Sequence, residues 1–240
     1  MNLAGVHESM ALRDKTLVFE DRTHAGALLA DLLAPYPLQG GLVLGIPAGG
    51  VEVGLAVARR LALPFDVAVV SKITLPWDTE AGYGAVAFDG TCLLNRPLIR
   101  RLGLSEDQIR EGMARTRSKI QRRMEAFRGK APFPDLRDRR VILVDDGLAS
   151  GFTMKTAIEA LRNLGADHLV VAVPTAHDQA VAHIAPLVEA VFCANIRRGL
   201  RFAVAEAYHH WTDVSETEVL ELLARHRGGK EAFSGGKSSG

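Results

Sequence analysis

Cysteine is scarce in this sequence, with only Cys92 and Cys193 among 240 residues, and the two lie far apart in apolar stretches. This excludes the disulfide framework of a small secreted domain, so we interpret both thiols as reduced interior residues. No apolar run approaches the roughly 20 residues that a membrane-spanning helix requires. The N-terminus also lacks the charged and apolar regions of a signal peptide. We therefore expect a cytoplasmic protein with no membrane partner.

An excess of charge of one sign is also missing, because 29 Lys and Arg nearly balance 28 Asp and Glu. With 48% hydrophobic residues, this balance argues against a disordered chain or a dedicated nucleic-acid-binding protein. No Walker motif, Gly-x-Ser-x-Gly elbow or dinucleotide-binding glycine motif stands in a suitable context, which disfavours NTPases, hydrolases and dehydrogenases. The histidines lack the spacing of zinc ligands. The function must be sought in local motifs.

Short apolar runs alternate with helical patterns along most of the chain. The runs that we interpret as strands are 42–46, 65–70, 141–145, 168–174 and 187–194. Helices are expected at 51–61 and 153–164, and Asp21 can cap a helix that ends at Ala34. Strands alternating with helices predict an α/β fold with an open, twisted, mostly parallel sheet flanked by helices. We expect one domain over residues 1–227.

Residues 95–138 differ from the rest and predict a helical insert or hood. Ser105 and Gln108 have the spacing of a capping box at the start of a long helix. Apolar residues then recur at steps of three and four, which gives a narrow seam one helix wide. Basic residues outnumber acidic ones here. Residues 228–240 are rich in Gly, Ser and Lys and are expected to form a flexible tail.

The segment 141–154, VILVDDGLASGFTM, contains the residues that we expect to bind a ligand. Asp145 and Asp146 follow a strand at the edge where open parallel sheets bind ligands. Gly147 and Gly151 allow the following loop to wrap a compact group. The helix beginning near Thr153 offers unpaired N–H groups and a positive dipole end, which suit a phosphate monoester.

This segment closely resembles the phosphoribosyl diphosphate signature of type I phosphoribosyltransferases. A looser likeness to an uncharacterised phosphoribosyltransferase-like branch lies in Phe202-Ala203-Val204 and Glu206 to Tyr208. The resemblance implies that Asp145 and Asp146 contact the ribose hydroxyls. It also implies that the loop binds the 5′-phosphate through Gly147, Ala149, Ser150, Gly151, Phe152 and Thr153. The family usually has Thr where Ser150 stands, a departure that keeps the hydroxyl.

Two further motifs fit the same family. The run Pro47-Ala48-Gly49-Gly50 follows a strand and resembles the family's pyrophosphate loop, in which backbone donors face the leaving group. Lys72 stands where the family has a basic residue near the start of a catalytic loop, so the resemblance implies that it contacts pyrophosphate. We expect residues 71–84 to form this mobile loop and to close over the substrate.

The resemblance implies transfer of the ribosyl 5-phosphate group from phosphoribosyl diphosphate to a nitrogenous base, with Asp145, Asp146 and Lys72 as catalytic residues. Mg²⁺ would arrive with the substrate and lie near Asp145 and Asp146. The aromatic residues considered as stacking partners for the base are Trp77, Tyr83, Phe152 and Tyr208. An alternative is a regulator that senses phosphoribosyl diphosphate or a nucleotide and binds nucleic acid through its basic insert. The insert could also mediate homo-oligomerisation, and the acceptor base stays open.

Overall fold

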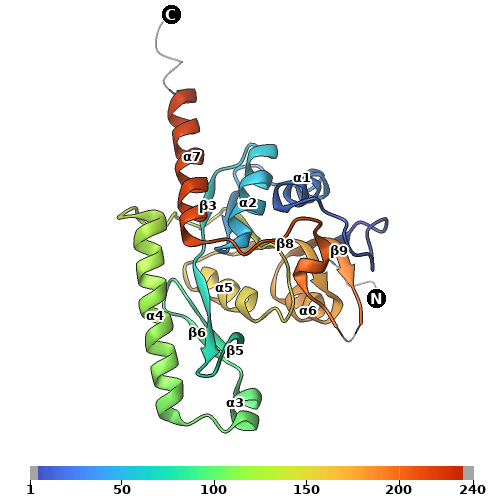
Figure 1. Ribbon diagram of the computed structural model, residues 1–240. Helices are drawn as coiled ribbons and strands as arrows, with labels where there is room; N and C mark the ends of the chain where they lie inside the picture. Colours follow the sequence, from blue (N-terminus) through green and yellow to red (C-terminus); the bar gives the residue numbers. More distant parts are fainter. Residues whose placement is uncertain (1–4, 200, 235–240) are drawn as a thin grey trace, which may run out of the picture.

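The computed structural model describes residues 5–199 and 201–234 (Figure 1). Its main sheet has six strands in the order β1-β9-β8-β7-β2-β3. Every neighbouring pair in this sheet is parallel. The strands are β1 (Val6–Glu8), β2 (Leu42–Gly45), β3 (Phe65–Val67), β7 (Arg140–Val144), β8 (His168–His177) and β9 (Ala190–Arg197). The sheet confirms the expected α/β fold, and β1 is a strand that the sequence pattern did not indicate.

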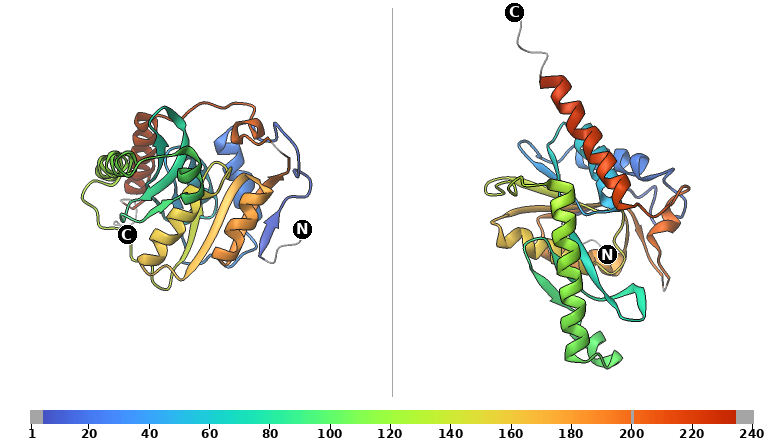
Figure 2. Two further views of the ribbon diagram at one scale, coloured as in Figure 1. Left: turned by 90° about the horizontal axis from the view of Figure 1, so that it is seen from below. Right: turned by 60° about the vertical axis from the view of Figure 1, so that its left-hand side comes forward.

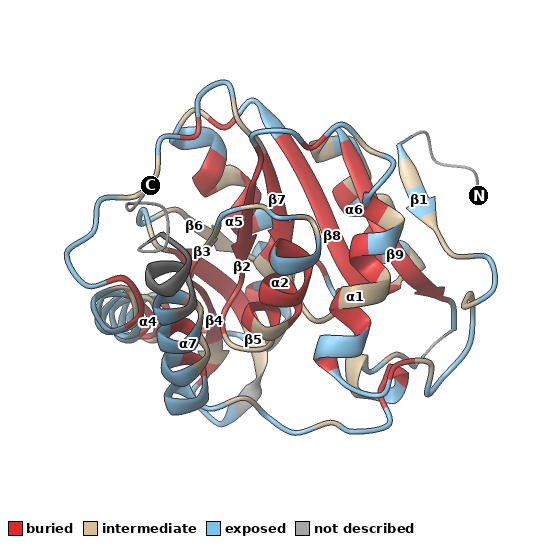
Figure 3. Cartoon of the chain, turned by 90° about the horizontal axis from the view of Figure 1, so that it is seen from above, coloured by how far each residue is buried: buried red, intermediate tan, exposed pale blue. Residues whose placement is uncertain are grey.

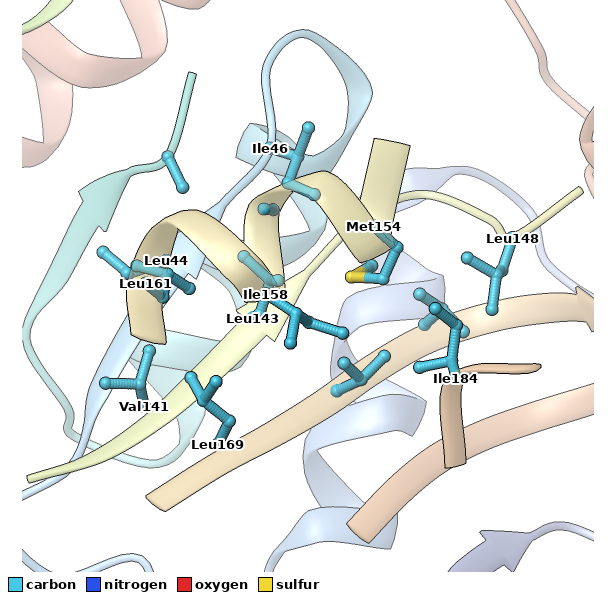
Figure 4. Packing of buried hydrophobic residues seen from close by; sticks show 14 of the residues in the cluster. Leu44, Ile46, Val141, Leu143, Leu148, Met154, Ile158, Leu161, Leu169 and Ile184 are labelled. Atoms are coloured by element: carbon cyan, nitrogen blue, oxygen red, sulfur yellow. The ribbon is translucent and has the colours of Figure 1, made fainter. Parts of the chain in front are cut away.

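Helices cover both faces of this sheet because successive side chains of a strand point to opposite sides. On one face Val43 and Ile142 pack with α1 (Arg22–Leu33) and α2 (Gly49–Arg60). On the other face Leu44, Val141 and Leu143 pack with α5 (Phe152–Asn163), as Figure 4 shows, and α6 (Asp178–Ile184) covers the same side. Apart from Arg140 and the two end residues of β8, the residues of the central strands β2, β7 and β8 are buried (Figure 3).

A second, antiparallel sheet has the order β4-β5-β6 and consists of β4 (Val70–Leu75), β5 (Asp78–Ala87) and β6 (Cys92–Leu94). The prediction of a loop at 71–84 is therefore wrong, since this segment forms a β-hairpin. The expected strand at 65–70 is likewise divided between β3 and β4. The hairpin is stable because Ile73, Leu75 and Tyr83 are buried in a hydrophobic cluster with the helix that follows. Its glycines and irregular register hid the strand alternation in the sequence.

The insert contains α3 (Arg96–Leu102) and the long helix α4 (Glu106–Arg128), which runs along the second sheet (Figure 2). The capping box of Ser105 and Gln108 is present as predicted. On the expected seam, the four residues Ile109, Thr116, Ile120 and Phe127 are buried. At the C-terminal end of α4, Arg128 forms two hydrogen bonds with the Asp66 carboxylate, at 2.9 and 2.8 Å. These bonds fix the helix to β3.

A short 3₁₀ helix, Ala185–Leu187, lies between α6 and β9. A second one, Val204–Ala207, and α7 (Glu216–Ser234) follow β9. Residues 228–234, which we expected to belong to a flexible tail, continue α7, while 235–240 lie outside the described residues. A helix can form here because glycine weakens but does not break helical structure, and Lys and Glu favour it. Among the described residues, no helix has the length and apolarity to cross a membrane.

Candidate active site

The two acids of the motif lie at the carboxyl edge of the main sheet. Strands β2 and β7 run parallel, with Gly45 opposite Val144, so the segments that leave them emerge side by side. Asp145 and Asp146 leave β7, and the loop with Gly49 leaves β2. A Cβ atom on Gly49 would lie 1.8 Å from Oδ2 of Asp146. Only glycine therefore permits this close approach between the two predicted loops.

Asp146 is held by a residue that the sequence analysis did not identify. Nε of Arg22, at the start of α1, donates a hydrogen bond to Oδ2 of Asp146 at 2.9 Å. Nη1 of Arg22 donates to the carbonyl oxygen of Thr212, and its guanidinium lies 3.9 Å from the centre of the Trp211 ring. The hydroxyl of Tyr208 donates to the carbonyl oxygen of Asp146 at 2.6 Å. Asp146 is thus fixed through both its side chain and its backbone.

Burial is the main cause of the pKa shifts of Asp145 and Asp146. Burial raises the pKa of the Asp145 carboxyl well above its usual range, and the charge of Asp146 adds to this shift. Burial also raises the pKa of Asp146, although Arg22 opposes the shift through its charge and hydrogen bond. One Asp145 oxygen accepts the backbone N–H of Asp146 at 2.9 Å. The two acids therefore favour a ligand that brings hydroxyl donors or positive charge.

The loop after the acids is anchored at its middle and open at its end. Leu148 is buried, its N–H donates to the carbonyl of Thr175, and its own carbonyl accepts the N–H of His177. Gly151 caps α5 with a positive φ of 75°, which glycine adopts without strain. The first N–H groups of α5 have no partner within the helix, and Ser150 next to them is exposed. This geometry offers a small anion several backbone donors.

These elements surround one cavity of about 430 Å³. Predicted site residues that line it are Ala48, Gly49, Lys72, Asp145, Asp146, Gly147, Ala149, Ser150, Gly151, Phe152 and Thr153. Gly50 does not line it, because it is buried against the backbone of Val144 and Asp145. Lys72, expected in a loop, projects from strand β4. The structure thus brings together residues from three separate motifs.

The cavity also includes residues to which no role was assigned from the motifs. These are Ser71 and Thr74 of β4, Lys119 and Arg123 of α4, and Val204 and Trp211 near the C-terminus. Of the four aromatic residues considered as stacking partners, Phe152 alone lines the cavity. The side chain of Trp77 is exposed, and those of Tyr83 and Tyr208 are buried in packing contacts. A site built from distant segments leaves no single local signal in the sequence.

Proteins that bind phosphorylated sugars or nucleotides typically present acids, a loop for a small anion and a close backbone approach at one edge of a parallel sheet, as this chain does. Comparison with known proteins narrows this class. A family model of the phosphoribosyl transferase domain matches residues 89–207. A Mycobacterium tuberculosis protein provisionally named a phosphoribosyl transferase is 39% identical over 217 residues, which cover 90% of this chain and 48% of that protein. The chain belongs to the phosphoribosyl transferase family.

Two further relatives extend the comparison. An orotate phosphoribosyltransferase of Streptomyces coelicolor is 30% identical over 120 residues, covering 45% of this chain and 65% of that enzyme. The crystal structure of the protein TT1426 from Thermus thermophilus is 35% identical, with a TM-score of 0.70, and the match covers 87% of this chain and 99% of that one. The chain spans about half the length of the Mycobacterium relative that it matches.

Proposed function

We propose that this protein transfers the 5-phosphoribosyl group of phosphoribosyl diphosphate to a ring nitrogen of a nitrogenous base and releases pyrophosphate. The observation that carries this proposal is the convergence of the Asp145–Asp146 pair, the loop that ends at Gly151 and the Gly49 backbone around one cavity. Membership of the phosphoribosyl transferase family supports the same chemistry. The base itself is a question for experiment.

Each chemical group of phosphoribosyl diphosphate can be assigned to one part of this cavity. Its 5-phosphate suits the loop from Gly147 to Thr153, where backbone N–H groups meet the N-terminus of α5. Its ribose hydroxyls would donate hydrogen bonds to the Asp145–Asp146 pair. The diphosphate would lie near Gly49, whose missing side chain leaves room for an ion, and near the exposed ammonium of Lys72.

In the transfer step, the lone pair of the acceptor nitrogen forms a bond to the anomeric carbon of the ribose. The bond from that carbon to the diphosphate oxygen breaks, its electron pair leaves with pyrophosphate, and the proton of the nitrogen passes to solvent. Positive charge develops on the ribose ring during this step, so the Asp145–Asp146 pair stabilises it and Lys72 stabilises the leaving group. The chain's contribution is mainly positioning and electrostatic stabilisation.

Mg²⁺ is expected to accompany the donor substrate. Asp145 and Asp146 provide the hard oxygen atoms that Mg²⁺ prefers. Within the described residues no group of three or more His, Cys, Asp or Glu could hold a metal ion by itself. The acid pair therefore fits an ion that is bound mostly by substrate oxygens, and such an ion would neutralise diphosphate charge.

The regulatory alternative, in which the basic insert binds nucleic acid, gains no support from the comparisons. The insert instead contributes Lys119 and Arg123 to the cavity lining, which supports a role of the insert in binding a small ligand. A transferase accounts for both the acids and the insert, so it is the function that we adopt.

The test is a pyrophosphate-release assay with phosphoribosyl diphosphate, Mg²⁺ and a panel of purine, pyrimidine and pyridine bases, orotate included. We expect release with at least one base and its loss in Asp146→Asn, since the neutral amide cannot balance positive charge on the ribose. Asp167→Asn is the matched control, because Asp167 is exposed and lies outside the cavity. An Asp146→Asn protein as active as the parent would overturn the assignment of this acid.

A further inference from the structure

Helix α4 presents two cationic side chains to the cavity that the donor substrate does not require. Lys119 and Arg123 are four positions apart, so they lie on the same face of the helix, one turn after the other. Both line the cavity, whereas the acids follow β7 and the phosphate loop leads into α5. The cavity therefore has a cationic wall that is separate from the elements assigned to phosphate and ribose.

Arg123 is held in a fixed orientation at this wall. Its Nε donates to Oε1 of Glu216 in α7 at 2.6 Å, and its Nη1 lies 3.4 Å from the hydroxyl oxygen of Ser71. Its side chain is 15% exposed and that of Glu216 is 54% exposed, so about half of the Glu216 side chain remains in contact with water. A guanidinium has five N–H donors in a planar fork, and these two contacts leave donors for a ligand.

Lys119 has no ion pair among the described residues, although the charges of Arg123 and Glu216 act on it. Burial lowers the pKa of its ammonium group, and the nearby charge of Arg123 lowers it further. An anion that bound between Lys119 and Arg123 would remove this repulsion. A planar carboxylate suits the pair, because it can accept from the guanidinium fork and from the ammonium group together.

We propose that the acceptor carries an anionic substituent, a carboxylate on its ring, and that Lys119 and Arg123 bind it. The inference rests on the proposed transferase function. Under that function the donor's phosphate, ribose and diphosphate already have partners in the loop before α5, in Asp145 and Asp146, and in Lys72 with Gly49. The cationic wall of α4 thus faces the remaining reactant, and it determines specificity by favouring an acidic base over its neutral analogue.

Matched pairs of acceptors test this specificity. Orotate and uracil differ by one ring carboxylate, and nicotinate differs from nicotinamide by a carboxylate in place of a neutral amide. We expect kcat/KM for the better of the two acidic bases to exceed that of its neutral partner by about tenfold or more, as for a charge-assisted hydrogen bond. Equal use of both members of each pair, or a preference for the neutral one, would overturn the proposal.

Variants of the two cations test the assignment of residues. Lys119→Met and Arg123→Gln should raise KM for the acidic acceptor about tenfold, with little change in KM for phosphoribosyl diphosphate. Lys119→Arg should retain most of the affinity because it keeps the charge. Arg122→Gln is the control, since Arg122 is exposed on α4 and does not line the cavity. A rise in KM for phosphoribosyl diphosphate alone would assign the pair to the donor and reject our proposal.

A separate measurement distinguishes failure of this inference from failure of the transferase function. If no base releases pyrophosphate, the transferase proposal fails, and calorimetric binding of orotate and nicotinate in the presence of phosphoribosyl diphosphate and Mg²⁺ then decides the anion site. Binding that is lost in Lys119→Met and kept in Arg122→Gln supports the site. Absence of binding to the parent protein, or binding that Lys119→Met leaves unchanged, overturns it.

Discussion

Arg22 and Asp146 are 124 positions apart in the sequence, yet the guanidinium of Arg22 donates directly to the carboxylate of Asp146 at 2.9 Å. Their side chains are only 6% and 17% exposed. Arg22 is the first residue of α1, which is capped by Asp21, and its position therefore depends on how α1 packs on the sheet. The N-terminal helix thus orients an acid of the candidate active site.

Replacing Arg22 by Met should destabilise the fold and weaken donor binding. The change leaves a buried carboxylate without its cation, which costs about 3 kcal/mol in a buried pair. Denaturant unfolding measures this loss. Arg60→Met is the control, since it breaks an exposed pair with Asp31 and should cost less than about 1 kcal/mol. Equal effects of the two substitutions would contradict a special role for Arg22.

Gly49→Ala should abolish the binding of phosphoribosyl diphosphate, while the rest of the chain keeps its stability. The added Cβ would lie 1.8 Å from Oδ2 of Asp146 and 3.0 Å from Nε of Arg22, so the acid must move. Calorimetry with phosphoribosyl diphosphate measures the effect. Gly228→Ala in α7 is the control, because a Cβ there meets nothing within 4 Å, and it should stabilise the helix by up to about 1 kcal/mol. Donor affinity that survives Gly49→Ala would show that this approach is not needed.

Asp145→Asn should change how stability depends on pH. The pKa of Asp145 is raised in the folded protein, mainly by burial. Such a carboxyl stabilises the fold below its unfolded pKa of about 3.9, and this contribution is lost as the pH rises through the folded pKa. The parent should therefore lose stability relative to Asp145→Asn as the pH rises from about 4 through the raised pKa of the folded protein. Measuring the unfolding free energy of both proteins across this pH range tests the direction of the change. A difference between the two proteins that stays constant with pH would contradict the raised pKa of Asp145.

The sequence alone was enough to predict the features that depend on residues close together in the chain. A buried strand, two acids, small loop residues and a helix occur consecutively at 141–163, so their geometry is set within one segment. The capping box at Ser105 and the buried seam of α4 are local in the same sense. Together with the motifs at Gly49 and Lys72, these patterns were enough to indicate the long helix, the main sheet apart from β1, and half of the residues that line the cavity.

The remaining residues of the site come together only through tertiary packing, so no pattern in the sequence indicated them. Arg22 begins an ordinary surface-type helix, and only the packing of α1 brings it to Asp146. From the sequence, Lys119 and Arg123 are expected to be solvated charges on α4. The packing of β4 and α7 beside this helix is what places them at the cavity. The hairpin of β4 and β5 was missed because its strand alternation is interrupted by glycines and by shifts in register. Side chains from separate elements cannot be paired from one sequence alone.

The ion pair between Arg128 and Asp66 should show strong coupling in a double-mutant cycle. Arg128 also donates to the carbonyl oxygens of Ala131 and Pro132, so its guanidinium links the end of α4 to the loop that follows. Arg128→Met should cost about 3 kcal/mol, because it leaves the Asp66 carboxylate partly buried and unpaired. Adding Asp66→Asn should then cost less than it does alone, with a coupling energy of about 1–3 kcal/mol from denaturant unfolding.

The exposed pair of Arg137 and Asp135 provides the control cycle, in which we expect no measurable coupling. Because Arg128 fixes the helix that carries Lys119 and Arg123, Arg128→Met should also raise KM for the acceptor more than KM for phosphoribosyl diphosphate. Additive effects in the Asp66 and Arg128 cycle would mean that α4 is positioned by its apolar seam alone. The acceptor side of the cavity would then tolerate loss of this pair.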